Sequence, residues 1–98
     1  MARVKQNVDP CALDVVSEVL CAITEPAEMR LFLKELLTPG EIRDITLRWR
    51  LLELLAEGTP QRKIAENLRI SLCKITRGSR ILKQKGAVTA RVLKSRGR

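Results

Sequence analysis

The segment TPQRKIAENLRISLCKITRGSRILK, residues 59–83, carries most of the information about the fold of this chain. From Pro60 to Asn67 the apolar residues are spaced as on one face of a short helix. A tight turn follows at Arg69-Ile70, and Ser71 can then cap a second helix from Leu72 to about Lys83. This pattern predicts a helix-turn-helix. Its small core would consist of Ile64, Leu68, Ile70 and Ile75.

An ordinary helical hairpin has the same spacing, so charge is needed to separate the two interpretations. The segment from Gln61 to Lys83 contains seven basic residues and one acidic residue, Glu66. The whole chain is divided in the same way, because residues 1–47 hold five bases and eight acids whereas residues 48–98 hold fourteen bases and three acids. This surplus favours a polyanionic partner, and nucleic acid fits it better than an anionic membrane surface.

The segments before residue 59 also have helical patterns. Asp9-Pro10, an N-cap followed by proline, predicts a helix over about 10–24, whose apolar stripe is wide enough to indicate burial against a second chain. Glu25-Pro26 begins a short second helix. The capping box Thr38-Pro39-Gly40-Glu41 begins a third helix, which ends where Gly58 can adopt a left-handed C-cap.

The third helix has apolar residues in two adjacent groups. One face carries Ile42, Ile45, Trp49, Leu52 and Ala56. Leu51, Leu54 and Leu55 lie beside that face. The spacing of both groups is helical.

These patterns together predict an all-α fold of five to six helices in a single domain over residues 1–98. Residues 10–57 would form dimerisation helices, residues 59–83 the DNA-reading head, and residues 84–98 a short basic tail with room for a two-turn helix. A chain of fewer than about 100 residues closes only a marginal core, so a homodimer is the expected assembly.

Composition argues against other classes of protein. The chain has no His and no Tyr, so it lacks the commonest general base and one substitute for it, and we expect no enzyme. Three cysteines without His cannot form the usual structural zinc sites, and we expect neither a metal nor a cofactor. No apolar run approaches the roughly 18 residues that cross a bilayer, and the polar N-terminus is unlike a signal peptide. The expected location is the cytoplasm, without a membrane partner.

Four segments of the chain resemble the bacterial Trp repressor family. They are Leu36-Leu37-Thr38-Pro39-Gly40-Glu41, Arg48-Trp49-Arg50, Gln61-Arg62 and Ile75-Thr76-Arg77-Gly78-Ser79 with Leu82-Lys83. The resemblance extends over roughly residues 31–83, and the Thr-Arg-Gly-Ser segment is far more specific than a generic helix-turn-helix. It implies an intertwined homodimer that represses genes of tryptophan biosynthesis or uptake. Such a repressor binds operator DNA only with L-tryptophan as its corepressor.

The same resemblance implies a site for L-tryptophan. Arg48 and Arg77 would hold the indole ring between their guanidinium planes, a role that lysine could not fill equally well. Thr38 and Arg77 would bind the carboxylate. Backbone carbonyls around Leu37 of the partner subunit would accept hydrogen bonds from the amino group, and Gly78 would leave room for the ring.

For DNA, the resemblance implies that the N-terminal part of the 72–83 helix enters the major groove. Base edges would be contacted, directly or through water, by Leu72, Cys73, Lys74 and Thr76. Phosphates or the edge of the groove would be contacted by Gln61, Arg62 and Lys83, and Arg80 would add positive charge.

Three departures from the family pattern leave alternatives open. Ile81 stands where relatives often carry a serine near the amino group of the ligand, and the loop Gly58-Thr59-Pro60 is one residue shorter than usual. Arg69 stands where such turns prefer glycine, so it either adopts a left-handed conformation or reshapes the turn. Two other functions therefore remain: a family member that binds DNA without responding to tryptophan, and a basic protein that coats nucleic acid without sequence preference.

Overall fold

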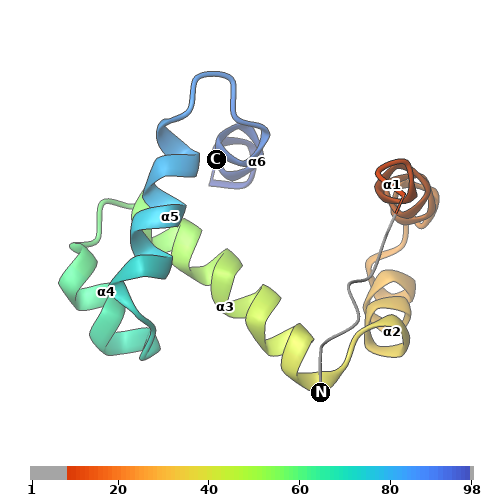
Figure 1. Ribbon diagram of the computed structural model, residues 1–98, viewed down its shortest axis with the longest axis horizontal. Coiled ribbons are helices and arrows are strands. Elements are labelled where there is room, and N and C mark those ends of the chain that lie inside the picture. Colours follow the sequence, from red (N-terminus) through yellow and green to blue (C-terminus); the bar gives the residue numbers. More distant parts are fainter. Residues whose placement is uncertain (1–8, 98) are drawn as a thin grey trace, which may run out of the picture. The chain divides into compact units, whose positions relative to one another are not determined.

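The computed structural model describes residues 9–97, and these residues form helices and connecting turns without a strand. The helices are α1 (Ala12–Ala22), α2 (Pro26–Leu36), α3 (Pro39–Ala56), α4 (Gln61–Leu68), α5 (Leu72–Lys83) and α6 (Val88–Gly97) (Figure 1). The all-α prediction is confirmed. None of the helices in residues 9–97 is both long and apolar enough to cross a membrane.

The chain divides into two compact units, Met1–Thr38 and Pro39–Arg98. The boundary coincides with the start of α3, where the sequence predicted a capping box and a proline at the first helical position. The first unit contains α1 and α2, and the second contains α3 to α6. A single domain over residues 1–98 stays a prediction.

The first helix begins later than predicted. The Asp9 carboxylate accepts the backbone N–H of Cys11 at 2.8 Å, and the Asp9 carbonyl accepts the backbone N–H of Ala12 at 2.8 Å. These two bonds form a turn, so α1 begins at Ala12 rather than at Pro10. It also ends at Ala22, two residues before the predicted end.

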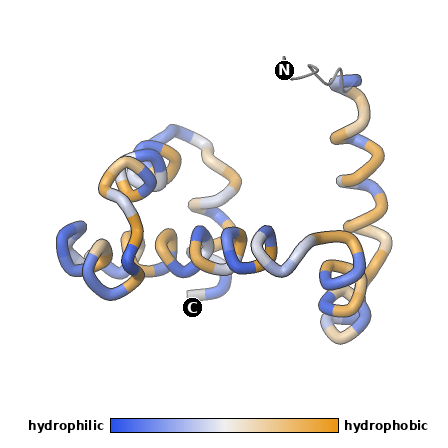
Figure 2. The backbone as a smooth tube through the Cα atoms, turned by 60° about the horizontal axis from the view of Figure 1, so that its bottom comes forward, coloured by the Kyte–Doolittle hydropathy of each residue, from blue (hydrophilic) through white to orange (hydrophobic). Residues whose placement is uncertain are grey.

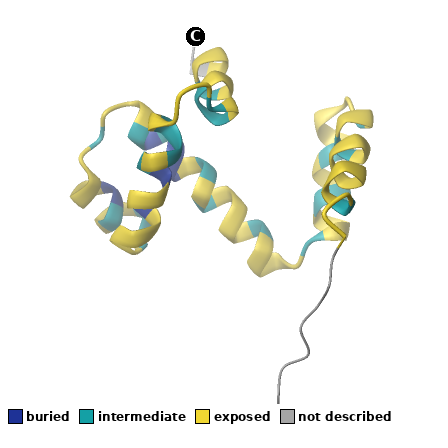
Figure 3. Cartoon of the chain, turned by 45° about the horizontal axis from the view of Figure 1, so that its top comes forward, coloured by how far each residue is buried: buried dark blue, intermediate teal, exposed yellow. Residues whose placement is uncertain are grey.

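The helices of the first unit bury no residue. Leu13 on α1 remains 69% exposed and Leu31 on α2 remains 59% exposed. Hydrophobic bands run along both helices in Figure 2, whereas Figure 3 shows the same helices without any buried residue. Six large apolar residues of these two helices are exposed: Leu13, Val15, Val16 and Val19 on α1, and Leu31 and Leu36 on α2.

The second unit has a small core where α3, α4 and α5 pack together (Figure 3). Ile64 of α4 and Ile75 of α5 are fully buried, and Leu51 and Leu54 of α3 complete the cluster. Ala65, Leu68 and Ile70 pack against it. The four core residues predicted for the helix-turn-helix therefore all lie in this core or against it. The buried residues of α3 are Leu51, Leu52 and Leu54, which come from both of the groups described above, whereas Ile45 is 47% exposed.

The turn between α4 and α5 uses a left-handed residue. Arg69 has φ 54° and ψ 49°, which is the first of the two conformations that the sequence left open. Ser71 then caps α5, because its hydroxyl accepts the backbone N–H of Lys74 at 3.3 Å. Gly58, with φ 89°, provides the predicted left-handed ending of α3.

The segment predicted as a short basic tail contains α6. Gly86, with φ 76°, lies in the turn that precedes it. The ten residues of α6 pack against both α3 and α5. The end of the chain is therefore part of the second unit and helps to form its surface hollows.

Candidate effector cavity and nucleic-acid interface

A cavity of about 230 Å³, here called the small cavity, lies between α3, α5 and α6. It is lined by Asp44, Leu47, Arg48, Leu51, Leu52, Ile70, Lys74, Arg77, Gly78, Ile81 and Thr89. Three of the residues predicted to bind the effector, Arg48, Arg77 and Gly78, are among them. Leu37 and Thr38 belong to the first unit, and their part in this site stays a prediction.

The two arginines reach the small cavity from different helices. Arg48 is on α3, one turn before the buried Leu52, and Arg77 is on α5, two residues after the buried Ile75. The core thus fixes both backbones while both side chains stay exposed. Leucines of α3 form an apolar wall next to them, so the cavity combines an apolar surface with two planar cations.

Gly78 has a structural role that the sequence analysis missed. A Cβ atom at this position would lie 3.2 Å from Leu55 Cδ1 and 3.4 Å from the Cδ2 atoms of Leu51 and Leu52. The missing side chain therefore allows α5 to approach α3 closely. This contact explains the glycine without any ligand, and its second role, leaving room for an indole ring, stays a prediction.

The charged groups of the small cavity are not neutralised by one another. Within residues 9–97, the side chains of Asp44, Arg48, Lys74 and Arg77 form no ion pair and no hydrogen bond. Asp44 was not predicted as a site residue. Its spacing of four residues from Arg48 was the available signal, since residues four apart lie on the same side of a helix.

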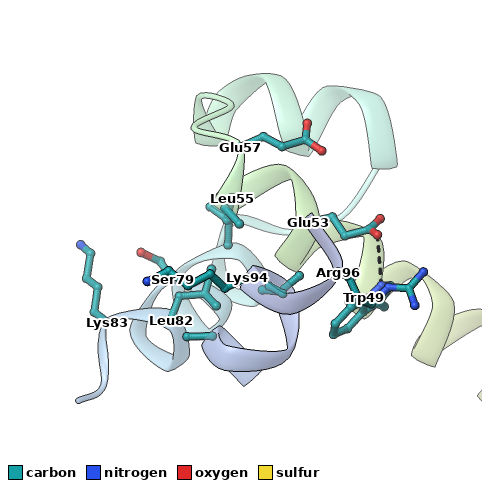
Figure 4. A pocket seen from close by; sticks show the side chains of 12 residues that line it. Trp49, Glu53, Leu55, Glu57, Ser79, Leu82, Lys83, Lys94 and Arg96 are labelled. Carbon is teal, nitrogen blue, oxygen red and sulfur yellow. Dashed lines mark hydrogen bonds between the residues drawn. The ribbon is translucent and has the colours of Figure 1, made fainter. Parts of the chain in front are cut away.

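A larger hollow of about 840 Å³ is also formed by α3, α5 and α6 (Figure 4). Trp49 and Glu53 lie on its wall, and the indole Nε1 donates a hydrogen bond to Glu53 Oε2 at 3.2 Å. Arg50 pairs with the other oxygen of the same carboxylate at 3.2 Å. Trp49 therefore belongs to a different surface from its neighbour Arg48.

The α5 surface, defined by Leu72, Cys73, Thr76, Arg77, Arg80, Ile81 and Gln84, borders a shallow hollow of about 510 Å³. Four residues predicted to contact DNA lie together here: Leu72, Cys73, Thr76 and Arg80. All four are exposed, and Cys73 is a free thiol. A helix that reads a DNA groove requires an exposed face bordered by basic side chains.

The other predicted DNA residues lie around this surface on different elements. Gln61 and Arg62 begin α4 and are exposed. Lys83 ends α5 and borders the larger hollow, whereas Lys74 lines the small cavity. The structure thus brings four of the eight predicted residues together on the α5 surface and places the other four outside it.

Arg77 and Ile81 line both the small cavity and the hollow of the α5 surface. They are four residues apart on α5, so they form one continuous strip of that helix. A molecule in the small cavity would touch the same two side chains that border the α5 surface. Occupancy of the cavity and the shape of that surface are therefore physically linked.

Comparisons with known proteins agree with these observations. A family model described as Trp repressor protein matches residues 11–96. A Trp operon repressor homolog from Xylella fastidiosa strain M23 is 36% identical over 69 residues, which are 69% of this chain and 75% of that protein. A Trp operon repressor homolog from Actinobacillus succinogenes is 47% identical over 53 residues, 53% of this chain and 52% of its own length. No solved structure gives a significant match.

Proposed function

This chain belongs to the Trp repressor family of non-enzymatic transcription regulators, and we propose that it is an operator-specific repressor activated by L-tryptophan. The proposed targets are genes of tryptophan biosynthesis or uptake, and the proposed place of action is the cytoplasm. The observation that carries the proposal is the small cavity, which Arg48 of α3 and Arg77 of α5 line together with leucines of α3.

The small cavity suits a ligand of the size of an amino acid. Its volume of about 230 Å³ is below the roughly 300–1,000 Å³ of sites for drug-sized ligands. The two guanidinium groups would stack on the indole, and the leucines would exclude water from it. Arg77 and Thr38 keep their assignment to the carboxylate, and Leu37 of the partner subunit keeps its assignment to the amino group.

The α5 surface is the proposed DNA-reading face. Leu72, Cys73 and Thr76 would contact base edges in the major groove, with Lys74 near the groove and Arg80 adding charge. Gln61, Arg62 and Lys83 would contact phosphates, which fixes the position of α5 on the duplex without reading sequence.

The proposed assembly is a homodimer. Its support is the apolar surface of α1 and α2, which leaves Leu13, Val15 and Leu31 each more than half exposed. A dimer would cover this surface and would present two copies of α5 to successive major grooves, about 34–36 Å apart.

Activation by tryptophan is proposed as a shift between conformations. A ligand held by Arg48 and Arg77 bridges α3 and α5, so it favours the orientation of α5 in which both groups grip it. The gain in DNA affinity is limited by how much more tightly the ligand binds this orientation of α5 than the other orientations. Linkage then requires operator DNA to tighten tryptophan binding by the same factor, typically about 5- to 150-fold.

The test uses Arg48→Ala and Arg77→Ala, with Arg43→Ala as the control because Arg43 is an exposed arginine of α3 outside the small cavity. Tryptophan affinity is measured by isothermal titration calorimetry, and operator affinity with and without tryptophan by fluorescence anisotropy. Each cavity variant should lose at least about tenfold in tryptophan affinity together with the tryptophan-dependent gain in DNA affinity. If both variants respond to tryptophan as the control does, the proposed site is wrong.

A second candidate is a family regulator whose DNA binding does not depend on tryptophan. Its specific support is Ile81, which lines the small cavity with an apolar side chain where relatives often have serine. The two candidates differ in one result, because this regulator would bind operator equally well with and without tryptophan. A sequence-indifferent basic protein would instead bind random duplex as well as operator, with a steep salt dependence.

A further inference from the structure

The small cavity contains a carboxylate for which the proposed tryptophan site has no use. Asp44 on α3 lies one turn before Arg48 and lines the cavity with the leucines of the same helix. Lys74 and Arg77 line it from α5. In the part of the chain that the structure describes, the Asp44 carboxylate has no cation within ion-pair distance.

Opposite charges that line one small cavity without pairing are complementary to a ligand that carries both signs. A free α-amino acid is such a ligand, because its ammonium group needs an acceptor and its carboxylate needs donors. The cations of α5 are suitable partners for the carboxylate. Among the residues that line this cavity, Asp44 is the one with a negative charge, and it is therefore the strongest acceptor for the ammonium group.

The neighbouring residues strengthen this assignment. Ile81 offers no hydrogen-bonding group on the α5 wall, so an ammonium group placed there would lose its partners from water. Thr89 of α6 offers a neutral hydroxyl, and the remaining wall consists of Gly78 and the apolar residues Leu47, Leu51, Leu52 and Ile70. The carboxylate of Asp44 on α3 is therefore the charged acceptor that the wall of this cavity offers.

We propose that Asp44 binds the α-ammonium group of the effector, in addition to the backbone carbonyls around Leu37 of the partner subunit, and makes the small cavity selective for amino acids over indole carboxylates that lack this group. The inference rests on the proposed function, because it assumes that the small cavity is the effector site. It adds a specificity residue on α3 to the two arginines that hold the ring.

The test compares two ligands on three proteins. The ligands are L-tryptophan and indole-3-propionate, which has the same ring and carboxylate without the ammonium group. The proteins are the native chain, Asp44→Asn, and Glu66→Gln as a control, since Glu66 is an exposed acid of α4 that lines none of the three hollows. Asparagine keeps the shape of Asp44 and removes its charge. Circular dichroism melting checks that all three proteins fold alike.

The expected result is a loss of affinity that is confined to one variant and one ligand. Asp44→Asn should weaken L-tryptophan binding about tenfold, the effect of losing a hydrogen bond to a charged group at a partly open site. Its affinity for indole-3-propionate should be equal to that of the native chain or higher, because a repulsion between carboxylates is removed. Glu66→Gln should leave both affinities unchanged.

Two kinds of result would overturn the inference, and they are distinguishable. Asp44 does not bind the ammonium group if Asp44→Asn weakens the binding of both ligands equally or of neither. The same holds if the native chain binds indole-3-propionate more tightly than L-tryptophan. In each of these cases the cavity still binds an indole ligand. If the native chain binds neither ligand, the proposed tryptophan site itself fails and the inference fails with it.

Discussion

Arg77 shows how one side chain can serve two surfaces. It borders the small cavity and the α5 surface, and its backbone is fixed by the buried Ile75 and Gly78 on either side. The resemblance predicted Arg77 as a ligand for tryptophan, but sequence alone did not show that the same residue also borders the reading surface. That position depends on how closely α5 packs against α3, which is a tertiary property.

The close packing around Gly78 leads to a prediction for a single residue. Adding a Cβ atom forces leucines of α3 to move by a few tenths of an ångström, because the three nearest contacts would be 3.2–3.4 Å. Overpacking costs about 1–3 kcal/mol, and the higher helix propensity of alanine returns up to about 1 kcal/mol. Gly78→Ala should therefore lower the free energy of unfolding by about 1 kcal/mol, measured by urea denaturation.

Gly40→Ala is the matched control for this prediction. Gly40 lies in the first turn of α3, and nothing is within 4 Å of an added Cβ atom. This variant should be neutral or slightly stabilising. Equal unfolding free energies for the two alanine variants would show that Gly78 is not needed for packing.

Among the elements, the prediction of α5 from Leu72 to Lys83 is confirmed at both ends, since Ser71 is a strong local cap. The start of α1 was predicted wrongly, because the Asp9 carboxylate bonds Cys11 and forms a turn before the helix. On α3 both groups of apolar residues have helical spacing, and it is packing in the second unit that buries Leu51, Leu52 and Leu54 and leaves Ile45 exposed. Local signals thus predicted where helices lie, whereas tertiary contacts determined which side is buried.

The left-handed residue in the turn between α4 and α5 leads to a prediction about stability. A left-handed conformation at a residue with a Cβ atom costs about 1–2 kcal/mol, and Arg69 adopts it. Arg69→Gly removes that cost but adds conformational entropy to the unfolded chain. The net result should be a gain of about 0.5–1 kcal/mol in unfolding free energy.

Arg80→Gly removes the same charge from the last turn of α5, where glycine costs up to about 1 kcal/mol, and should destabilise the protein. Thermal denaturation of both variants beside the native chain measures the difference. A lower melting temperature for Arg69→Gly would contradict a strained turn.

For the whole molecule, the exposed residues of α1 and α2 and the strongly basic second half of the chain support different parts of the proposal. The apolar residues support a dimer, and the bases support binding to a polyanion. The wide apolar stripe of the first predicted helix and the distribution of charge along the sequence indicated both features. The small cavity was not predictable in this way, because it brings residues of α3, α5 and α6 together and depends on their packing.

Sedimentation velocity tests the proposed dimer. The native chain should sediment as a dimer, and Val19→Glu should shift it toward monomer by at least about tenfold in dissociation constant, because it places a charge on the apolar surface of α1. Glu18→Gln, on the same helix, should leave the dimer intact. A native chain that is monomeric at all micromolar concentrations would contradict the homodimer.

The central claim is that L-tryptophan controls operator binding through the small cavity. Its most direct test is a gel-shift titration of the native protein on a palindromic promoter fragment at one stated salt concentration, with and without L-tryptophan, beside a random duplex of equal length. We predict that tryptophan strengthens the promoter complex about 5- to 150-fold and leaves the random duplex nearly unchanged. Equal promoter binding in the presence and absence of tryptophan would contradict the claim.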